Sequence, residues 1–191
     1  METADKKKRF PRAAAIGVAH ELCVALEPVT LRLSVAGSLR RGRADVGDVE
    51  ILYVPQFEAR RIDLFQEAPV DLAAERIEQL VAGGTLAKRQ NARGSTSWGE
   101  KNRLAVHVAS GIPVDLFAAT EANWWNYLVC RTGPAEQNVA ICKAAIARGW
   151  KWQPYGAGFT RLDGSSEVGM LSEREVFEFV GLPYLQPRQR R

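Results

Sequence analysis

The fold of this 191-residue chain is decided by the stretch AGSLRRGRADVGDVEILYV, residues 36–54. It opens on Gly37 and Ser38, and such a turn lets the backbone approach a ligand while the hydroxyl donates to a phosphate oxygen. Its exposed N–H groups would also favour an anion. Arg40 and Arg41 follow, and the planar fork of arginine clamps phosphates. The start of the stretch therefore predicts a phosphate-binding turn.

The second half of the stretch places carboxylates beside that turn. Asp48 and Glu50 open a strand expected over Asp48–Val54, and residues two apart in a strand point to the same side. Carboxylates this close repel each other unless cations bind between them. A third carboxylate, Asp115, stands in an otherwise apolar strand candidate, Val114–Ala118, where a lone charge is costly. If the two strands are neighbours, the three carboxylates converge.

Three carboxylates and a triphosphate form the ligand set for a pair of Mg²⁺ ions. One metal would lower the pKa of an attacking hydroxyl, and the other would stabilise the leaving pyrophosphate. The residues alone therefore predict nucleotidyl transfer to an unspecified acceptor.

Composition sets the class of protein. The chain is 46% hydrophobic and 25% charged, as in soluble globular proteins, and its net charge of +4 is compatible with a nucleic-acid partner. Cys23, Cys130 and Cys142 form no C-x-x-C pair, which argues against a disulfide framework and a structural zinc site. Because no apolar run is long enough for a signal peptide or a membrane span, we expect no membrane association and a cytoplasmic location.

Hydrophobic periodicity predicts an α+β fold: a mixed sheet with helices over residues 1–120, then a small helical part with a short hairpin over residues 121–191. In the first helix, the expected buried face is Ile16, Ala19, His20, Cys23 and Leu26. Ser172 and Glu175 form an expected capping box before the last helix. The helices are predicted over Ala13–Leu26, Val70–Val81, Trp124–Arg131, Ala135–Arg148 and from Ser172 through Val180; the strands over Leu31–Val35, Asp48–Val54, Leu86–Gln90, Leu104–Ala109 and Val114–Ala118; and the hairpin over Trp150–Thr160.

The motifs of the first part resemble a known family. Residues 37–41 and 47–50 together resemble the catalytic signature of the DNA polymerase β superfamily of nucleotidyltransferases, and residues 114–116 resemble its third carboxylate strand. This resemblance implies that residues 1–120 are a nucleotidyltransferase palm domain.

The C-terminal third narrows the resemblance. Residues 131–134, RTGP, with Asn138 and Gly149 resemble the segment with which X-family DNA polymerases hold the incoming nucleotide. Residues 171–188 resemble that family's closing helix and tail. From about residue 12 onward, the chain resembles a minimal X-family polymerase without an N-terminal lyase domain, and we expect no lyase activity. The resemblance makes residues 121–191 a nucleotide- and DNA-binding subdomain.

The family pattern assigns a role to each matching position. The implied partners are a dNTP and primer-template or gapped DNA, the implied cofactor is two Mg²⁺ ions, with Mn²⁺ as a possible substitute, and the expected state is a monomer. Asp115 would also activate the primer 3′-hydroxyl. The implied residues are Asp48, Glu50 and Asp115 for the metals, Gly37, Ser38 and Arg41 for the triphosphate, and Gly133 and Asn138 for the sugar and base.

Three departures from the family pattern keep alternatives open. Glu50 stands where the second ligand is usually Asp, Cys130 and Arg131 replace a Tyr-Phe pair at the sugar pocket, and Cys142 replaces an arginine at the template strand. The leading hypothesis is a template-directed DNA polymerase that fills gaps in repair. The first alternative is another nucleotidyltransferase, active in template-independent tailing, ribonucleotide addition or modification of a small molecule or protein. The second is a basic DNA-binding module whose metal site has decayed.

Overall fold

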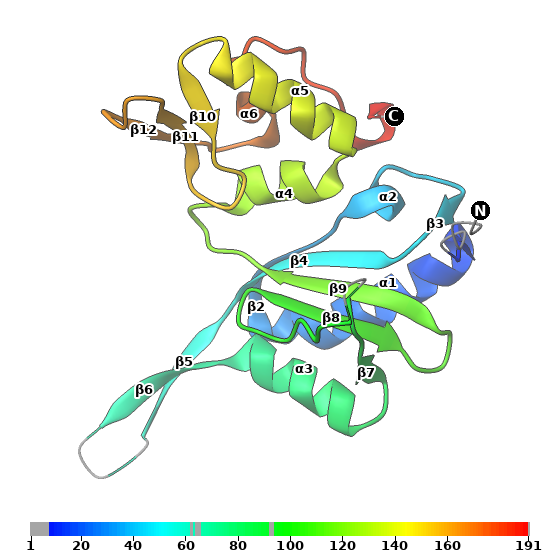
Figure 1. The fold of residues 1–191 in the computed structure, drawn as a ribbon. Helices are drawn as coiled ribbons and strands as arrows, with labels where there is room; N and C mark the ends of the chain where they lie inside the picture. Colours follow the sequence, from blue (N-terminus) through cyan, green and yellow to red (C-terminus); the bar gives the residue numbers. More distant parts are fainter. Residues whose placement is uncertain (1–7, 62, 64–65, 92–93, 191) are drawn as a thin grey trace.

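A five-stranded mixed sheet forms the centre of the computed structural model, which describes residues 8–61, 63, 66–91 and 94–190 (Figure 1). The strand order is β2-β4-β9-β8-β7, with β4 parallel to β9 and the other neighbours antiparallel. Buried and partly exposed residues alternate along β8, as expected for a sheet with two different faces. The strands are β2 (Thr30–Val35), β4 (Val49–Pro55), β7 (Leu86–Lys88), β8 (Asn102–His107) and β9 (Ile112–Ala118).

Helices α1 (Arg12–Leu26) and α3 (Leu72–Ala82) cover one face of this sheet, and Figure 1 shows both on the same side. Their core with the sheet includes the fully buried Leu22, Ile51 and Ile77. The opposite face is covered at the far end of β4 and β9 by α4 (Trp124–Thr132). The predicted carboxylates lie on the same face, on the amino-terminal side of this contact along β4 and β9.

The predicted buried face of α1 was wrong in part. The helix buries Ala15, Val18 and Leu22 together with two of the expected residues, whereas Ile16 is 42% exposed and His20 is exposed. Because the helix carries small apolar residues on several sides, the periodicity fits more than one stripe. Packing against the sheet selects the stripe that contains Leu22.

Two short segments of the first part differ from the sequence expectations. The segment predicted to be a phosphate-binding turn is a short helix, α2 (Gly37–Arg40). The loop that follows it forms β3 (Asp45–Val46), which pairs with β1 (Phe10–Pro11). A hairpin of β5 (Phe57–Arg61) and β6 (Glu67–Asp71) projects from the sheet in Figure 1. Its largely polar sequence hides it from periodicity.

The C-terminal lobe packs a second core around Val129, Phe159 and Phe177. The predicted capping box is partly confirmed, because the Ser172 hydroxyl accepts a hydrogen bond from the Glu175 amide at 3.1 Å. The predicted hairpin has a third strand, too short to show in the sequence. The elements are η1 (Glu27–Val29) before β2 and, in this lobe, α5 (Ala135–Ile146), β10 (Trp150–Trp152), β11 (Gly158–Arg161), β12 (Glu167–Gly169), α6 (Glu173–Phe179) and η2 (Pro187–Gln189).

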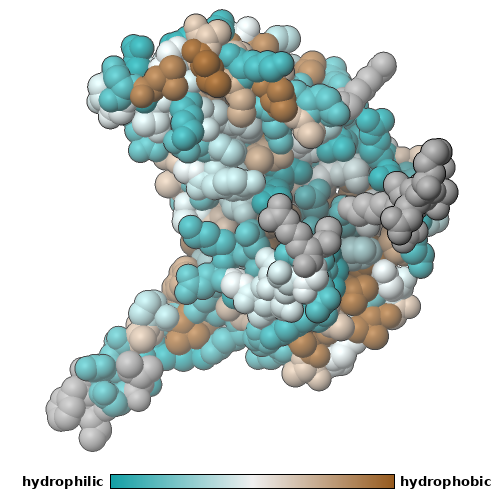
Figure 2. Space-filling view, in the orientation of Figure 1, coloured by the Kyte–Doolittle hydropathy of each residue, from teal (hydrophilic) through white to brown (hydrophobic). Residues whose placement is uncertain are grey.

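The surface of the C-terminal lobe is mixed in character. Figure 2 shows hydrophobic side chains gathered on this upper lobe, where α5 leaves Val139 and Ile146 at least half exposed. Within the described ranges, no helix is both long and apolar enough to cross a membrane. The predicted α+β architecture is confirmed, while the division at residues 120 and 121 stays a prediction.

Candidate active site

The register of the central sheet brings Glu50 and Asp115 side by side. Strands β4 and β9 pair with Glu50 directly opposite Asp115, so the two side chains point to the same face. That face is the one away from α1 and α3, because the neighbouring Ile51 and Leu116 point into the core. Asp48 immediately precedes β4. The strand adjacency on which the three-carboxylate prediction depends is therefore present.

The carboxylates act on one another electrostatically. Burial, together with the negative charges of Asp48 and Asp115, raises the pKa of Glu50 to about 7, while Arg131 and Arg41 oppose the rise. At Glu50, burial and the neighbouring negative charges thus outweigh the two arginines. A divalent cation would relieve this repulsion, and three carboxylates are suitable ligands for Mg²⁺ or Mn²⁺.

The donor chemistry therefore fits a divalent metal, but the side chains do not yet form a closed ligand set. Among the residues that the structure describes, no three His, Cys, Asp or Glu side chains are grouped as a ready-made metal site. Metal binding would require the carboxylates to turn toward one another.

Gly37 fits closely against this cluster. Its φ of +62° lies in the left-handed region, and a Cβ atom at this position would overlap with Oε2 of Glu50. Only glycine meets both requirements without strain. The start of α2, with the partly buried Ser38, therefore passes directly over the Glu50 carboxylate.

Arg41 connects the same turn to the C-terminal lobe. Its guanidinium donates a hydrogen bond to the Thr132 carbonyl, and its Nη1 lies 3.2 Å from the Cβ that a residue larger than glycine would have at position 133. Burial lowers the pKa of Arg41, and the nearby Arg43 lowers it further. The Nε of Arg41 is buried without a hydrogen-bond partner. The predicted triphosphate turn and Gly133 thus meet around one arginine.

Asn138 lies behind that meeting point. Its Nδ2 donates to the Cys130 carbonyl at 2.8 Å, which ties the start of α5 to the end of α4. Its Oδ1 is buried without a hydrogen-bond partner. The structure therefore places Asn138 beside the segment that leads into Gly133, and its role toward a base stays a prediction.

Arg131 lies in an aromatic cage that sequence reasoning did not foresee. Its guanidinium carbon is 3.7 Å from the centre of the Phe117 ring and within 5.5 Å of the Tyr127 and Tyr155 ring centres. Its charge also lowers the pKa of Glu50. The three rings come from distant parts of the sequence, so the sequence could not predict the cage. The only hint was that Cys130 and Arg131 replace the family's Tyr-Phe pair.

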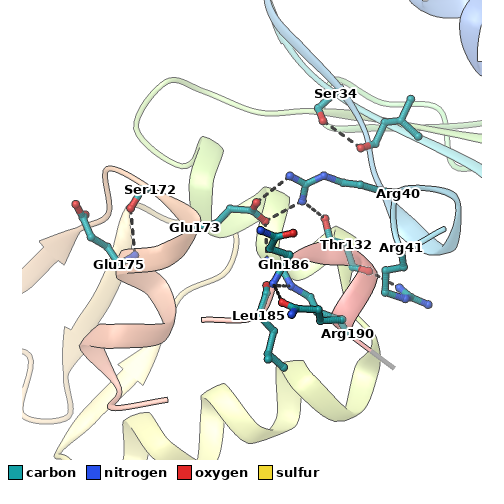
Figure 3. A network of polar contacts seen from close by, with 12 residues as sticks. Ser34, Arg40, Arg41, Thr132, Ser172, Glu173, Glu175, Leu185, Gln186 and Arg190 are labelled. Atoms are coloured by element: carbon teal, nitrogen blue, oxygen red, sulfur yellow. Dashed lines mark hydrogen bonds and ion pairs between the residues drawn. The ribbon is translucent and has the colours of Figure 1, made fainter. Parts of the chain in front are cut away.

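A buried ionic network joins the two lobes beside the phosphate turn (Figure 3). Arg40 of α2 donates to both carboxylate oxygens of Glu173 in α6, each at 2.8 Å, and to the Thr132 hydroxyl at 2.7 Å. The fully buried Arg190 donates to the same carboxylate at 3.2 Å. Arg40, predicted beside Arg41 as a phosphate clamp, is thus engaged with the C-terminal lobe in this structure. No sequence motif had indicated Glu173 or Arg190.

A cavity of about 1080 Å³ lies at the other end of β4 and β9. Its walls include Val54, Phe57, Tyr127, Arg131 and Tyr155. It contains none of the predicted site residues, so we base the site on the carboxylate face instead.

The fold is thus an α+β arrangement in which the carboxylate face of a mixed sheet meets a helical lobe at α2. The family model described as DNA polymerase beta thumb matches residues 127–191. The chain is 26% identical over 192 residues to the DNA polymerase/3′-5′ exonuclease PolX of Bacillus subtilis (strain 168). That match covers 99% of the chain but only 30% of the relative's length.

The solved structures give a matching fold. Leishmania infantum polymerase beta, in a structure described as a ternary P/T complex, aligns with a TM-score of 0.70 at 18% identity, covering 96% of this chain and 77% of that one. With the thumb match and the relative, this fold makes the chain an X-family polymerase-like protein.

Proposed function

We propose that this chain is a DNA-directed DNA polymerase that adds dNTPs to a primer 3′-hydroxyl, in gap-filling repair. The single observation that carries the proposal is the register that sets Glu50 opposite Asp115, with the glycine turn at Gly37 pressed against the Glu50 carboxylate. Carboxylates and a phosphate-binding turn then share one face. Such a face suits a reaction in which a triphosphate is attacked and pyrophosphate leaves.

The chain's own residues would divide the work. Asp48, Glu50 and Asp115 would hold two Mg²⁺ or Mn²⁺ ions, which supply a more acidic hydroxyl and neutralise phosphate charge. Asp115 would also take part at the primer hydroxyl. The residues proposed to hold the dNTP are Gly37, Ser38 and Arg41 for the triphosphate, and Gly133 and Asn138 for the sugar and base.

Three observations support DNA as the acceptor. The thumb model matches residues 127–191, which are most of the C-terminal lobe, and the matching Leishmania structure is described as a P/T complex. The net charge of +4 favours a polyanionic partner. We also propose that the protein acts as a monomer in the cytoplasm.

Primer extension tests the proposal directly. Labelled primer is offered on a template and across a one-nucleotide gap, with Mg²⁺ or Mn²⁺ and with single dNTPs. We expect extension by the nucleotide that complements the template. No extension with either metal would contradict the proposal.

The second candidate function is nucleotidyl transfer with another acceptor or nucleotide, and the aromatic cage around Arg131 favours it. Arg131, stacked on Phe117, and Cys130 form the region proposed for the sugar, so a guanidinium and a thiol replace two rings. Omitting the template and replacing dNTPs by rNTPs separates the two functions. Strictly template-directed dNTP addition removes the second candidate function, whereas equal tailing without template supports it. A non-enzymatic DNA-binding module predicts DNA binding with no pyrophosphate release.

A further inference from the structure

Arg89 stands in the same row of the central sheet as the carboxylates. It directly follows β7, and its backbone N–H donates to the Leu104 carbonyl at 3.0 Å, which continues the β7–β8 ladder by one residue. Leu104 lies opposite Asp115, which in turn lies opposite Glu50. Four neighbouring positions therefore run from Arg89 to Glu50 at one level of the sheet, whose strands are labelled in Figure 1.

The side chain of Arg89 belongs to the carboxylate face. The preceding Lys88 pairs with Glu78 of α3 at 3.5 Å, and its partner Ala105 is fully buried in the core under the helices. Because successive strand residues alternate in direction, Arg89 points away from α3. It thus projects over the same open face as Asp115.

Arg89 crosses an intervening strand to reach Asp115. Neighbouring strands are about 4.8 Å apart, so β8 puts roughly 10 Å between the backbones of Arg89 and Asp115. The Nη2 of Arg89 donates to Oδ1 of Asp115. Its Nε donates to the Ala105 carbonyl at 3.0 Å, so the guanidinium is fixed by backbone before it meets the carboxylate. A lysine could span the gap but could not make both contacts with one rigid fork.

We propose that Arg89 is a positioning residue for Asp115: it holds the carboxylate on the open face beside Glu50, from which Asp115 serves the metal site once the carboxylates turn toward one another. The inference rests on the proposed function. The Arg89 contact engages Oδ1, so the guanidinium orients Asp115 from the side of β7, while Glu50 lies beside it on β4. Hydrogen bonds to a ligating carboxylate fix its direction, and losing such a bond typically weakens metal binding 10- to 100-fold.

The experiment compares Arg89→Gln with Arg89→Lys and with Lys88→Gln as the matched control. Lys88 is adjacent in sequence, similar in charge and on the opposite face of the sheet. The first readout is Mn²⁺ affinity by electron paramagnetic resonance on the whole chain without DNA or nucleotide. The second is single-nucleotide extension, separated into kcat and KM for the dNTP.

We expect Arg89→Gln to weaken Mn²⁺ binding about 10- to 100-fold and to lower kcat, with little change in KM for the dNTP. Arg89→Lys should recover part of both losses, and Lys88→Gln should match the wild type. A purely structural role would instead lower thermal stability while leaving metal affinity unchanged in the folded fraction.

Unchanged or tighter Mn²⁺ binding by Arg89→Gln would overturn the inference, and tighter binding would make Arg89 a competitor of the metal. If the wild type extends primers, that result leaves the proposed function standing. If the wild type neither binds Mn²⁺ nor extends a primer, both proposals fall together. Should Arg89→Gln fail to fold, Arg89→Lys decides, because wild-type metal affinity in that variant contradicts the need for the fork.

Discussion

Two charged clusters lie on either side of α2, the predicted phosphate-binding turn, and they differ in how their charges are paired. On the palm, burial and the like charges of Asp48 and Asp115 together raise the pKa of Glu50 to about 7. At the lobe junction, the Glu173 carboxylate is matched by two arginines, Arg40 and Arg190. At Glu50, burial and like charge outweigh the nearby arginines, although Arg89 pairs with Asp115, whereas the Glu173 carboxylate is paired with two arginines.

The difference is the one expected between a site that binds a cation, as proposed for the carboxylates, and a structural joint. A cluster of like charges is costly in the free protein, and a bound cation would stabilise it. A buried, paired cluster needs no ligand, but it cannot lose one member without exposing the others to a low-dielectric environment. Substitutions in the two clusters should therefore affect different properties.

The largest effect is expected at Asp48. Asp48→Asn removes a charged ligand and should slow turnover about a thousandfold, since a metal contributes several kcal/mol to the transition state and each 1.36 kcal/mol is tenfold in rate. Pyrophosphate release with primer-template and dNTP measures it. Asp45→Asn is the matched control, because Asp45 is an exposed carboxylate on β3. Equal rates in Asp48→Asn and the control would end the site assignment.

The next effect is on stability and comes from Glu173. This side chain is 8% exposed, and Glu173→Ala would leave the fully buried Arg190 without its carboxylate. Removing one partner of a buried ion pair costs about 3–5 kcal/mol, so we expect a loss of this size in the free energy of unfolding. Urea denaturation measures it. A loss below about 1 kcal/mol would show that the network does not hold the lobes.

A smaller effect, of opposite sign, is expected at Glu50. Its folded pKa of about 7 exceeds the unfolded value of 4.5, so the folded state favours the protonated acid and stability falls as pH rises from 4.5 through 7. Glu50→Gln removes this penalty and should stabilise the metal-free protein by about 1–3 kcal/mol near pH 8, with little gain near pH 5. Urea denaturation in EDTA at both pH values is the measurement. A gain in the free energy of unfolding that does not depend on pH would contradict the raised pKa of Glu50 in the folded protein.

The smallest effect is expected at Glu178, one turn along α6 from the buried network. Its ion pair with Arg174 is exposed: the Arg174 side chain is 62% accessible and the Glu178 side chain 55%. Glu178→Ala should change the free energy of unfolding by less than about 0.5 kcal/mol. The variant is also the helix-matched control for Glu173→Ala. A loss as large as that of Glu173→Ala would mean that α6, not the buried charge, sets stability.

Local patterns predicted the carboxylate face well. The two-residue spacing of Asp48 and Glu50 and the lone Asp115 in an apolar run suffice to predict two strands with acids on one face. The structure confirms that these strands are neighbours. The roles of the side chains stay predictions, because no sequence pattern or strand register reports what binds.

Long-range features were beyond the sequence. Arg89 meets Asp115 only because β8 pairs with both of their strands, and Glu173 meets Arg40 only because the lobes pack together. The face of α1 was misjudged for a different reason, since an alanine-rich helix offers several apolar stripes. Periodicity identifies elements, but the partners across a sheet or between lobes come from packing.

The most direct test of the account is Mg²⁺-dependent primer extension by Asp115→Asn beside the wild type. Asparagine keeps the size of the side chain and removes its charge. The account predicts that the wild type extends the primer, while the variant extends it at least about a thousandfold more slowly and binds primer-template DNA equally well. Extension by Asp115→Asn at the wild-type rate would contradict the claim that the carboxylate face carries the reaction.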